Sequence, residues 1–234
     1  MKIPLPKNFQ PQKPLTINDY QDLIVTIYCS QIQPQQFSFE KLKEKNIISL
    51  DEKLSKPIIK RNNLLQLIFD SGIVISIELG RISFYSKINK NIGNLVDLIQ
   101  KFTQIYNKYN WQKIRLTFKR FLSFPNTGKK GSKFFPDEFI NSNLSWNVEG
   151  KSPSQVQLNF FYNFPNHPLL LSINQIVVKL KNKSRQGLLF KGIFNYNLRE
   201  KKSIEKISFL NSIVLHYENN LTIFNKIIDQ NILS

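Results

Sequence analysis

The stretch WQKIRLTFKRFLSF, residues 111–124, decides the fold that the sequence predicts. From Ile114 to Phe118 apolar residues alternate with polar ones, which is typical of a strand with one buried face. After Lys119 the alternation breaks, because Arg120 stands where the pattern requires an apolar residue. A slip of one residue exchanges the two faces of a strand, so we expect a β-bulge at Lys119–Arg120.

The residues before this strand predict an antiparallel meander backed by one helix. Apolar runs separated by Asp-Ser-Gly and Gly-Arg turns are typical of hairpin-linked strands. We expect strands at residues 23–29, 64–69, 73–79 and 82–85. Over 95–109 apolar residues recur every three or four positions, which predicts an amphipathic helix with Asn94 as its N-cap. The pattern is weaker between the first two strands, where we expect a short helix over 37–46 and a loop over 57–62.

The residues after the 111–124 strand predict a second sheet and a longer helix. A short helix is expected over 137–142. We expect strands at residues 144–149, 155–163, 169–181 and 188–197. From Ser203 onward, apolar residues at alternating spacings of four and three form a stripe on one helix face: Leu210, Val214, Tyr217, Leu221, Phe224 and Ile228.

These elements predict an α+β fold in which two antiparallel sheet-plus-helix halves pack together. Prolines at positions 4, 6, 11 and 14 exclude helix at the start, so residues 1–19 are expected to form an extended arm. An N-terminal sheet-and-helix subdomain is expected over 20–125 and a C-terminal one over 126–234. No low-complexity linker separates the two, so we expect them in tight contact.

The charge balance indicates the kind of partner. Lys and Arg number 33 against 16 Asp and Glu in 234 residues, a formal net charge of +17. Such an excess attracts polyanions, either nucleic acid or an anionic membrane surface. A compositional bias toward Lys is an alternative explanation, but it does not account for the scarcity of Asp and Glu. We therefore expect nucleic acid, either RNA or single-stranded DNA, rather than a membrane.

Several classes of site are poorly supported. Cys29 is the only cysteine, which excludes an internal disulfide and a cysteine-based zinc site. With only two histidines, His167 and His216, and no H-x-x-x-H spacing, we expect no metal ion and no cofactor. The Pro-rich start lacks the apolar core of a signal peptide, and no apolar run is long enough to span a membrane. We expect a cytoplasmic protein.

The central strand and the last helix together resemble an uncharacterised, sporadically distributed family of bacterial proteins. In this sequence the strand runs R-L-T-F-K-R-F-L from Arg115 to Leu122, and the helix carries Leu215-His216 and then Phe224. The family's strand reads roughly R-L-G-L-R-Y-I-N-R-I, so Arg120 and Leu122 stand where the family has Tyr and Asn. The resemblance covers most of the chain and implies no established activity. The family's patchy distribution implies a role in bacterial defence or mobile-element systems.

The basic loop after the central strand, TGKKGSKFF, is the first candidate for nucleic-acid contacts. Its glycines let the backbone approach phosphate, Lys129, Lys130 and Lys133 supply charge, and Phe134 can stack on a base. Its spacing is too short for a phosphate-binding P-loop, which requires G-x-x-x-x-G-K-[ST]. The alternative is a solvated loop whose phenylalanines fold back into the core.

Two further basic groups are candidates. One is the predicted hairpin tip with Lys179, Lys181, Lys183 and Arg185, which either reaches nucleic acid or protects the sheet from pairing with other sheets. The other is the central strand itself, with Arg115, Lys119 and Arg120. On a solvated face these three would track a single-stranded backbone, whereas under the 95–109 helix they would form structural ion pairs.

The sequence thus predicts a non-catalytic, nucleic-acid-binding accessory protein. One alternative is a small metal-independent ribonuclease in which His216 takes part, although a half-buried structural role fits that histidine better. Another is an assembly subunit whose basic and aromatic surfaces hold an acidic protein partner within a larger complex.

The loop lysines generate a first prediction. Replacing Lys129, Lys130 and Lys133 together should flatten the salt dependence of single-strand binding by about two units, because each phosphate contact contributes about 0.7 to the slope. Sequence preference should not change, because phosphate contacts position rather than specify. Binding titrations over a range of salt concentrations measure the slope. An unchanged slope would mean that the three lysines make no phosphate contact and serve only to keep the protein soluble.

Overall fold

The computed structural model describes residues 18–90, 92–123, 157–164, 167–180 and 183–230, which contain nine strands, four α-helices and one short 3₁₀ turn, Pro34–Gln36. Of the arm predicted over 1–19, residues 1–17 lie outside the described residues, and residues 18 and 19 belong to the first strand. The basic loop, the short helix over 137–142 and the strand over 144–149 also lie outside the described residues. The strands are β1 (Asn18–Tyr28), β2 (Ile59–Arg61), β3 (Leu64–Ile68), β4 (Val74–Glu78), β5 (Arg81–Lys87), β6 (Lys113–Ser123), β7 (Gln157–Phe164), β8 (His167–Leu180) and β9 (Lys183–Asn197). The helices are α1 (Phe39–Glu44), α2 (Ile92–Ile105), α4 (Ser203–Leu215) and α5 (Tyr217–Ile228).

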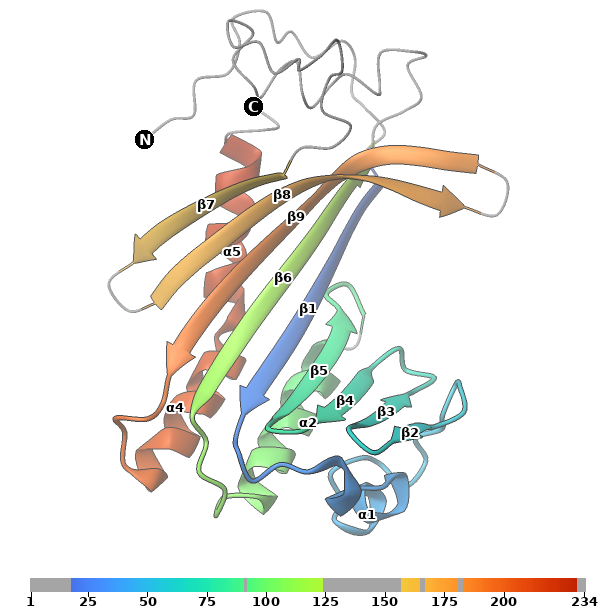
Figure 1. Ribbon diagram of the computed structural model, residues 1–234, viewed down its shortest axis with the longest axis vertical. Coiled ribbons are helices and arrows are strands. Elements are labelled where there is room, and N and C mark those ends of the chain that lie inside the picture. Colours follow the sequence, from blue (N-terminus) through green and yellow to red (C-terminus); the bar gives the residue numbers. More distant parts are fainter. Residues whose placement is uncertain (1–17, 91, 124–156, 165–166, 181–182, 231–234) are drawn as a thin grey trace, which may run out of the picture.

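All nine strands form one antiparallel sheet in the order β2-β3-β4-β5-β1-β6-β9-β8-β7 (Figure 1). The α+β class is therefore confirmed. The two predicted sheets are parts of a single sheet, because β6 pairs with β1 on one side and with β9 on the other. β6 is the strand that joins the N-terminal strands to the C-terminal ones.

The predicted bulge at Lys119–Arg120 is wrong. β6 pairs without interruption from Lys113 to Ser123 with both neighbours, so its side chains alternate strictly between the two faces. Arg120 therefore lies on the face that carries the core and is only 7% exposed. Its Nη1 atom donates to Asp229 Oδ1 at 2.7 Å and to Asn225 Oδ1 at 3.3 Å, at the end of α5. The ion pair gives the buried guanidinium a partner, so the strand accepts an arginine in an apolar row without a change of register.

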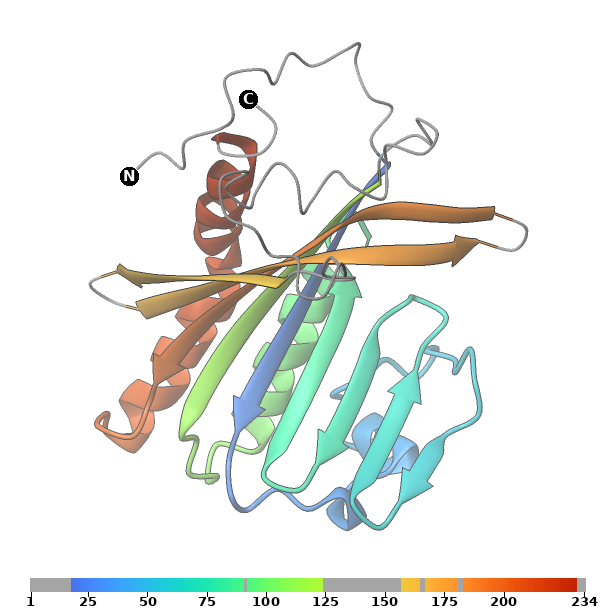
Figure 2. The ribbon, with the colours of Figure 1, turned by 45° about the horizontal axis from the view of Figure 1, so that its top comes forward.

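The helices cover one face of the sheet and close the core there (Figures 1 and 2). Under α2, Phe102 contacts Phe84 of β5 edge to face, with ring centroids 5.6 Å apart. Under α5, Phe224 stacks on Phe118 of β6 at 5.9 Å. A hydrogen bond from Thr103 Oγ1 to an α4 asparagine joins the helices across the same face. No helix that the structure describes covers the opposite face of the sheet, and we term this side the open face.

The last two helices carry the predicted apolar stripe. Five of its six residues are buried, and Leu221 packs at its margin. The stripe is divided between α4 and α5 at His216, which ends the first helix and whose Nδ1 atom lies 2.9 Å from the Ser212 carbonyl oxygen. Phe224 comes so close to β9 that a Cβ atom at Gly192 would lie 2.5 Å from its Cδ2 atom. Glycine at this position allows α5 to rest directly on the sheet.

Two local predictions differ from the structure. The short edge strand β2, Ile59–Arg61, lies in the segment expected to be a loop; its three residues are all exposed and give no alternating burial. Helix α2 begins at Ile92, so Asn94 lies within its first turn and does not cap it. Ile92 packs against the core, which extends the helix beyond the predicted start.

The close approach at Gly192 predicts opposite effects for two Gly→Ala changes. Gly192→Ala should destabilise the fold by about 1–3 kcal/mol, because the added methyl group overlaps the Phe224 ring. Gly93→Ala, in α2 and with no atom within 4 Å of the added Cβ, should instead stabilise it by about 0.4–1 kcal/mol. Chemical denaturation measures both, and equal effects of the same sign would contradict this packing.

Candidate nucleic-acid interface

The open face presents positive charge on its central strands. Because side chains alternate along β6, Lys113, Arg115 and Lys119 project to this face, opposite the buried apolar row. Lys191 of β9 lies on the same face, in register with Lys119. Asp22 of β1, which accepts a hydrogen bond from Tyr85, is the carboxylate on the other side of Lys119. Among the side chains that the structure describes on β1, β6 and β9, four cations thus lie on this face together with the carboxylate of Asp22.

The pairing of Lys119 with Lys191 is unfavourable for the sheet itself. Side chains directly opposite in an antiparallel pair have Cβ atoms roughly 4.5–5.5 Å apart, and like charges there are destabilising. Lysines protect edge strands from pairing with other chains, but β6 and β9 are interior strands. Neither lysine forms an ion pair within the part of the chain that the structure describes. No carboxylate of a described residue lies within ion-pair distance of either ammonium group.

Exposed aromatic side chains lie on the same face of the sheet as these cations. Tyr20, 56% exposed, stacks on Phe121 of β6 with ring centroids 6.5 Å apart. Phe161 of β7 is 69% exposed, and its neighbour across the β7–β8 pair is Leu170. Exposed rings and lysines on one sheet surface are the groups that stack on bases and attract phosphates in single-strand-binding proteins.

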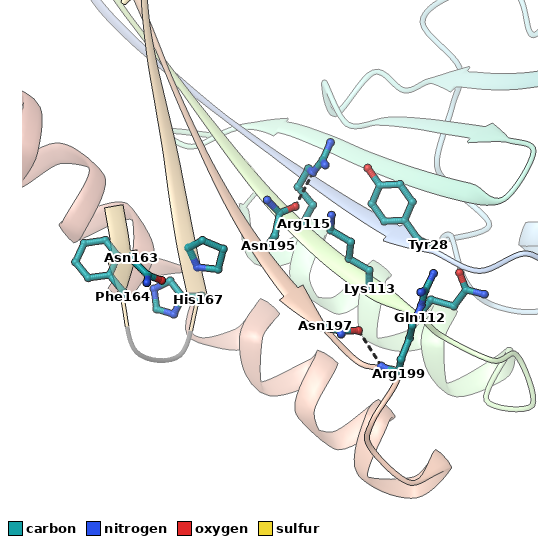
Figure 3. Close-up of a pocket in the computed structure, with 11 residues that line it drawn as sticks. Tyr28, Gln112, Lys113, Arg115, Asn163, Phe164, His167, Asn195, Asn197 and Arg199 are labelled. Carbon is teal, nitrogen blue, oxygen red and sulfur yellow. Dashed lines mark hydrogen bonds between the residues drawn. The ribbon is translucent and has the colours of Figure 1, made fainter. Parts of the chain in front are cut away.

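A pocket of about 680 Å³ opens at one end of this face (Figure 3). The β8–β9 pairing starts at Leu169–Phe194, so the first residues of β8 and the last residues of β9 diverge. The pocket lies between the β7–β8 hairpin on one side and the ends of β6 and β9 on the other. Its lining residues are Tyr28, Gln112, Lys113, Arg115, Asn163, Phe164, His167, Pro168, Asn195, Asn197 and Arg199.

The charges in this pocket are all of one sign. Lys113, Arg115 and Arg199 supply three cations, and none of the described residues that line it is acidic. Arg115 is oriented by its neighbour on β9, because its Nε atom donates to Asn195 Oδ1 at 2.9 Å. Its guanidinium carbon also lies 5.5 Å from the centre of the Tyr28 ring, a cation–π contact.

The lysine of this pocket shows the effect of crowded positive charge. Burial lowers the pKa of Lys113 below its ordinary value, and the nearby Arg115 and Arg199 lower it further. Like charges disfavour the protonated amine, and a bound anion would relieve that repulsion. The pocket is therefore electrostatically matched to an anionic group.

His167 is one of the residues on the hairpin side of the pocket, and its ring is directed to the helix side of the sheet. Its ring packs against Tyr196 and Phe194, with centroids 5.0 and 5.4 Å away. Burial lowers the pKa of His167, so the imidazole is neutral at pH 7. Its Nε2 atom is buried and has no hydrogen-bond partner among the described residues.

The three predicted basic groups have different outcomes. Arg115 and Lys119 share the open face, whereas Arg120 lies on the opposite face in its ion pair with Asp229, so it does not belong to this surface. Lys129, Lys130, Lys133 and Phe134 lie outside the described residues. In the hairpin group, Lys179 and Lys183 belong to paired strands, the partner positions being Ser184 and Leu180. Arg185 pairs with Val178 through the backbone, and Lys181 is not described.

Three cations of the interface were not predicted from the sequence: Lys113, Lys191 and Arg199. The alternation of the 111–124 strand contained a signal for Lys113, which is two positions before Arg115. No sequence pattern indicates Lys191, because only the β6–β9 register places it beside Lys119. His216, the candidate for a ribonuclease, is on the helix side and does not line the pocket.

Comparison with known proteins assigns no family: no family model matches the chain, and no curated protein matches it in sequence. The resemblance to the sporadic bacterial family stays a prediction. Among the described residues, no group of three or more His, Cys, Asp or Glu side chains is placed to hold a metal ion. None of the described helices has the length and apolar character needed to cross a membrane.

The pocket environment predicts how His167 titrates. Its midpoint should lie below the ordinary value of 6.5, because burial disfavours the imidazolium. The unfolded chain then binds more protons than the folded one, so this histidine's contribution to stability is fully present above about pH 6.5 and is lost as the pH falls from there through the lower midpoint of the folded state. Proton NMR of the ring signals, assigned with a His167→Asn variant, measures the midpoint. A midpoint at or above 6.5 would contradict the buried position.

Proposed function

We propose that the protein binds single-stranded nucleic acid across the open face of β1, β6 and β9, as an accessory protein without catalysis of its own. The observation that carries the proposal is the Lys119–Lys191 pair, directly opposite on two interior strands. Such a pair costs stability in the free protein, and a phosphate backbone lying over it removes the repulsion. Arg115 and Lys113 extend the same positive surface toward the pocket.

A single strand suits this surface better than a duplex. Stacking on aromatic side chains requires bases that are not paired with another strand, and the Tyr20–Phe121 stack and Phe161 present such rings. The groups on this surface are mainly lysines and aromatic rings, rather than an ordered set of donors and acceptors that could read base edges. We therefore expect strong salt dependence and weak sequence preference.

The competing function is that of an assembly subunit for an acidic protein partner, which the same positive charge would attract. The aromatic residues favour nucleic acid, because carboxylate side chains have no flat ring to stack. Polyglutamate of matched charge is a suitable competitor. If it displaces a labelled oligonucleotide as effectively as an unlabelled oligonucleotide does, the acidic-protein alternative is favoured instead.

The decisive variant is Lys119→Gln combined with Lys191→Gln. It should lower affinity for a single-stranded oligonucleotide and flatten the salt slope by about 1.4 units, two contacts at about 0.7 each. Fluorescence anisotropy at several salt concentrations measures both quantities. The free energy of unfolding should not fall, because the change removes a repulsion between neighbours.

The matched control removes the same charge from the helix side. Lys101→Gln with Lys226→Gln changes two exposed lysines of α2 and α5, away from the open face. This control should leave the slope within about 0.3 units of the parent. An equal loss in both double variants would show that net charge alone governs binding and would refute the proposed face.

A further inference from the structure

We infer that the pocket at the end of the open face binds the phosphorylated end of the nucleic-acid strand, so that the protein prefers strands with a terminal phosphate. This inference rests on the proposed function, because it assigns a specific end of the same strand to a specific place. Its basis is the conjunction of three cations and a cavity in one site, with no acidic side chain among the described lining residues.

The position of the pocket makes it a terminus for a bound strand. Arg115 and Lys113 belong both to the open face and to the pocket lining, so the two positive surfaces are continuous. Beyond them the β7–β8 hairpin diverges from β9 and forms the far wall (Figure 3). A chain that follows the lysines along the sheet therefore enters a recess at this end.

The size of the pocket exceeds what a phosphate alone needs. A volume of about 680 Å³ falls within the range of sites that enclose whole small ligands, so a complete nucleotide fits. Phe164 and Pro168 on the hairpin give it an apolar wall. Three asparagine side chains around the rim supply both donors and acceptors, which suits a base edge without selecting one base.

The charge of the pocket distinguishes an end from the middle of a strand. A backbone phosphodiester carries one negative charge, whereas a terminal phosphomonoester carries about −1.5 to −2 near pH 7 and has three strong acceptor oxygens. Three cations without a carboxylate among the described lining residues favour the group of higher charge. Arg115 uses its Nε atom on Asn195, which leaves its terminal N–H groups for two parallel bonds to phosphate oxygens.

The test compares three single-stranded oligonucleotides of one sequence with an internal fluorescent label. One carries a 5′-phosphate, one a 3′-phosphate, and one has hydroxyl groups at both ends. We expect the full chain to bind one phosphorylated form about 10- to 100-fold more tightly than the hydroxyl form, the range for an added charged hydrogen-bond contact. Which form it is identifies the end that occupies the pocket.

Arg199→Gln and Lys113→Gln locate the preference. Each variant should reduce the ratio of affinities for phosphorylated and hydroxyl ends toward one. Arg61→Gln, which removes an exposed arginine from the edge strand β2, should leave the ratio unchanged. A nucleoside monophosphate with its phosphate at the preferred end should compete for the phosphorylated oligonucleotide and not for the hydroxyl form.

The outcomes separate the two proposals. Equal binding of all three oligonucleotides would overturn end recognition and leave binding on the open face intact. A preference that survives both pocket variants would place the end elsewhere and would also overturn it. Loss of binding to every oligonucleotide, with the polyglutamate competitor still bound, would overturn the proposed function and the end recognition together.

Discussion

The hydrogen bonding of β6 on both sides is the constraint on which the other features depend. Because all eleven of its residues pair with β1 and with β9, the strand cannot bulge, and every side chain has a fixed face. Arg120 must therefore enter the core, where Asp229 neutralises it. Asp229 lies at the C-terminal end of α5, where a negative charge is unfavourable because of the helix dipole. The ion pair with Arg120 therefore stabilises α5 as well as the arginine. The alternate residues of β6, including Lys119, must face the open side of the sheet.

The two faces of the sheet follow different physical rules as a result. On the helix face, aromatic rings interlock closely enough that Gly192 has no space for a side chain below Phe224. On the open face, like charges oppose each other and rings stay exposed, which lowers the stability of the isolated fold. The contacts of the helix face are therefore completed within the protein itself. In the proposed function, a bound polyanion neutralises the opposed positive charges of the open face.

Local patterns in the sequence predicted most of the strands, the apolar stripe of the last helix and the α+β class, because alternation and helical spacing depend on neighbouring residues. The predicted bulge is wrong because the alternation along β6 alone contains no information on the partner of Arg120. A partner for Arg120 more than one hundred residues away could not be foreseen. The candidate site was predicted in part for a similar reason. Arg115 and Lys119 came from one strand, whereas Lys191 and the pocket depend on the β6–β9 register and on the divergence of a hairpin.

The position of β1 has a consequence for the order in which the chain folds. Residues 18–28 pair with residues 113–123 on one side and with β5, the last strand of the meander, on the other, so β1 is an interior strand that is synthesised well before β6. It must wait for a partner on the order of one hundred residues downstream, and long-range antiparallel pairing of this kind is slow. During that interval the apolar side of β1 and its unpaired backbone groups are exposed. The nascent chain is therefore most prone to aggregate before β6 is complete.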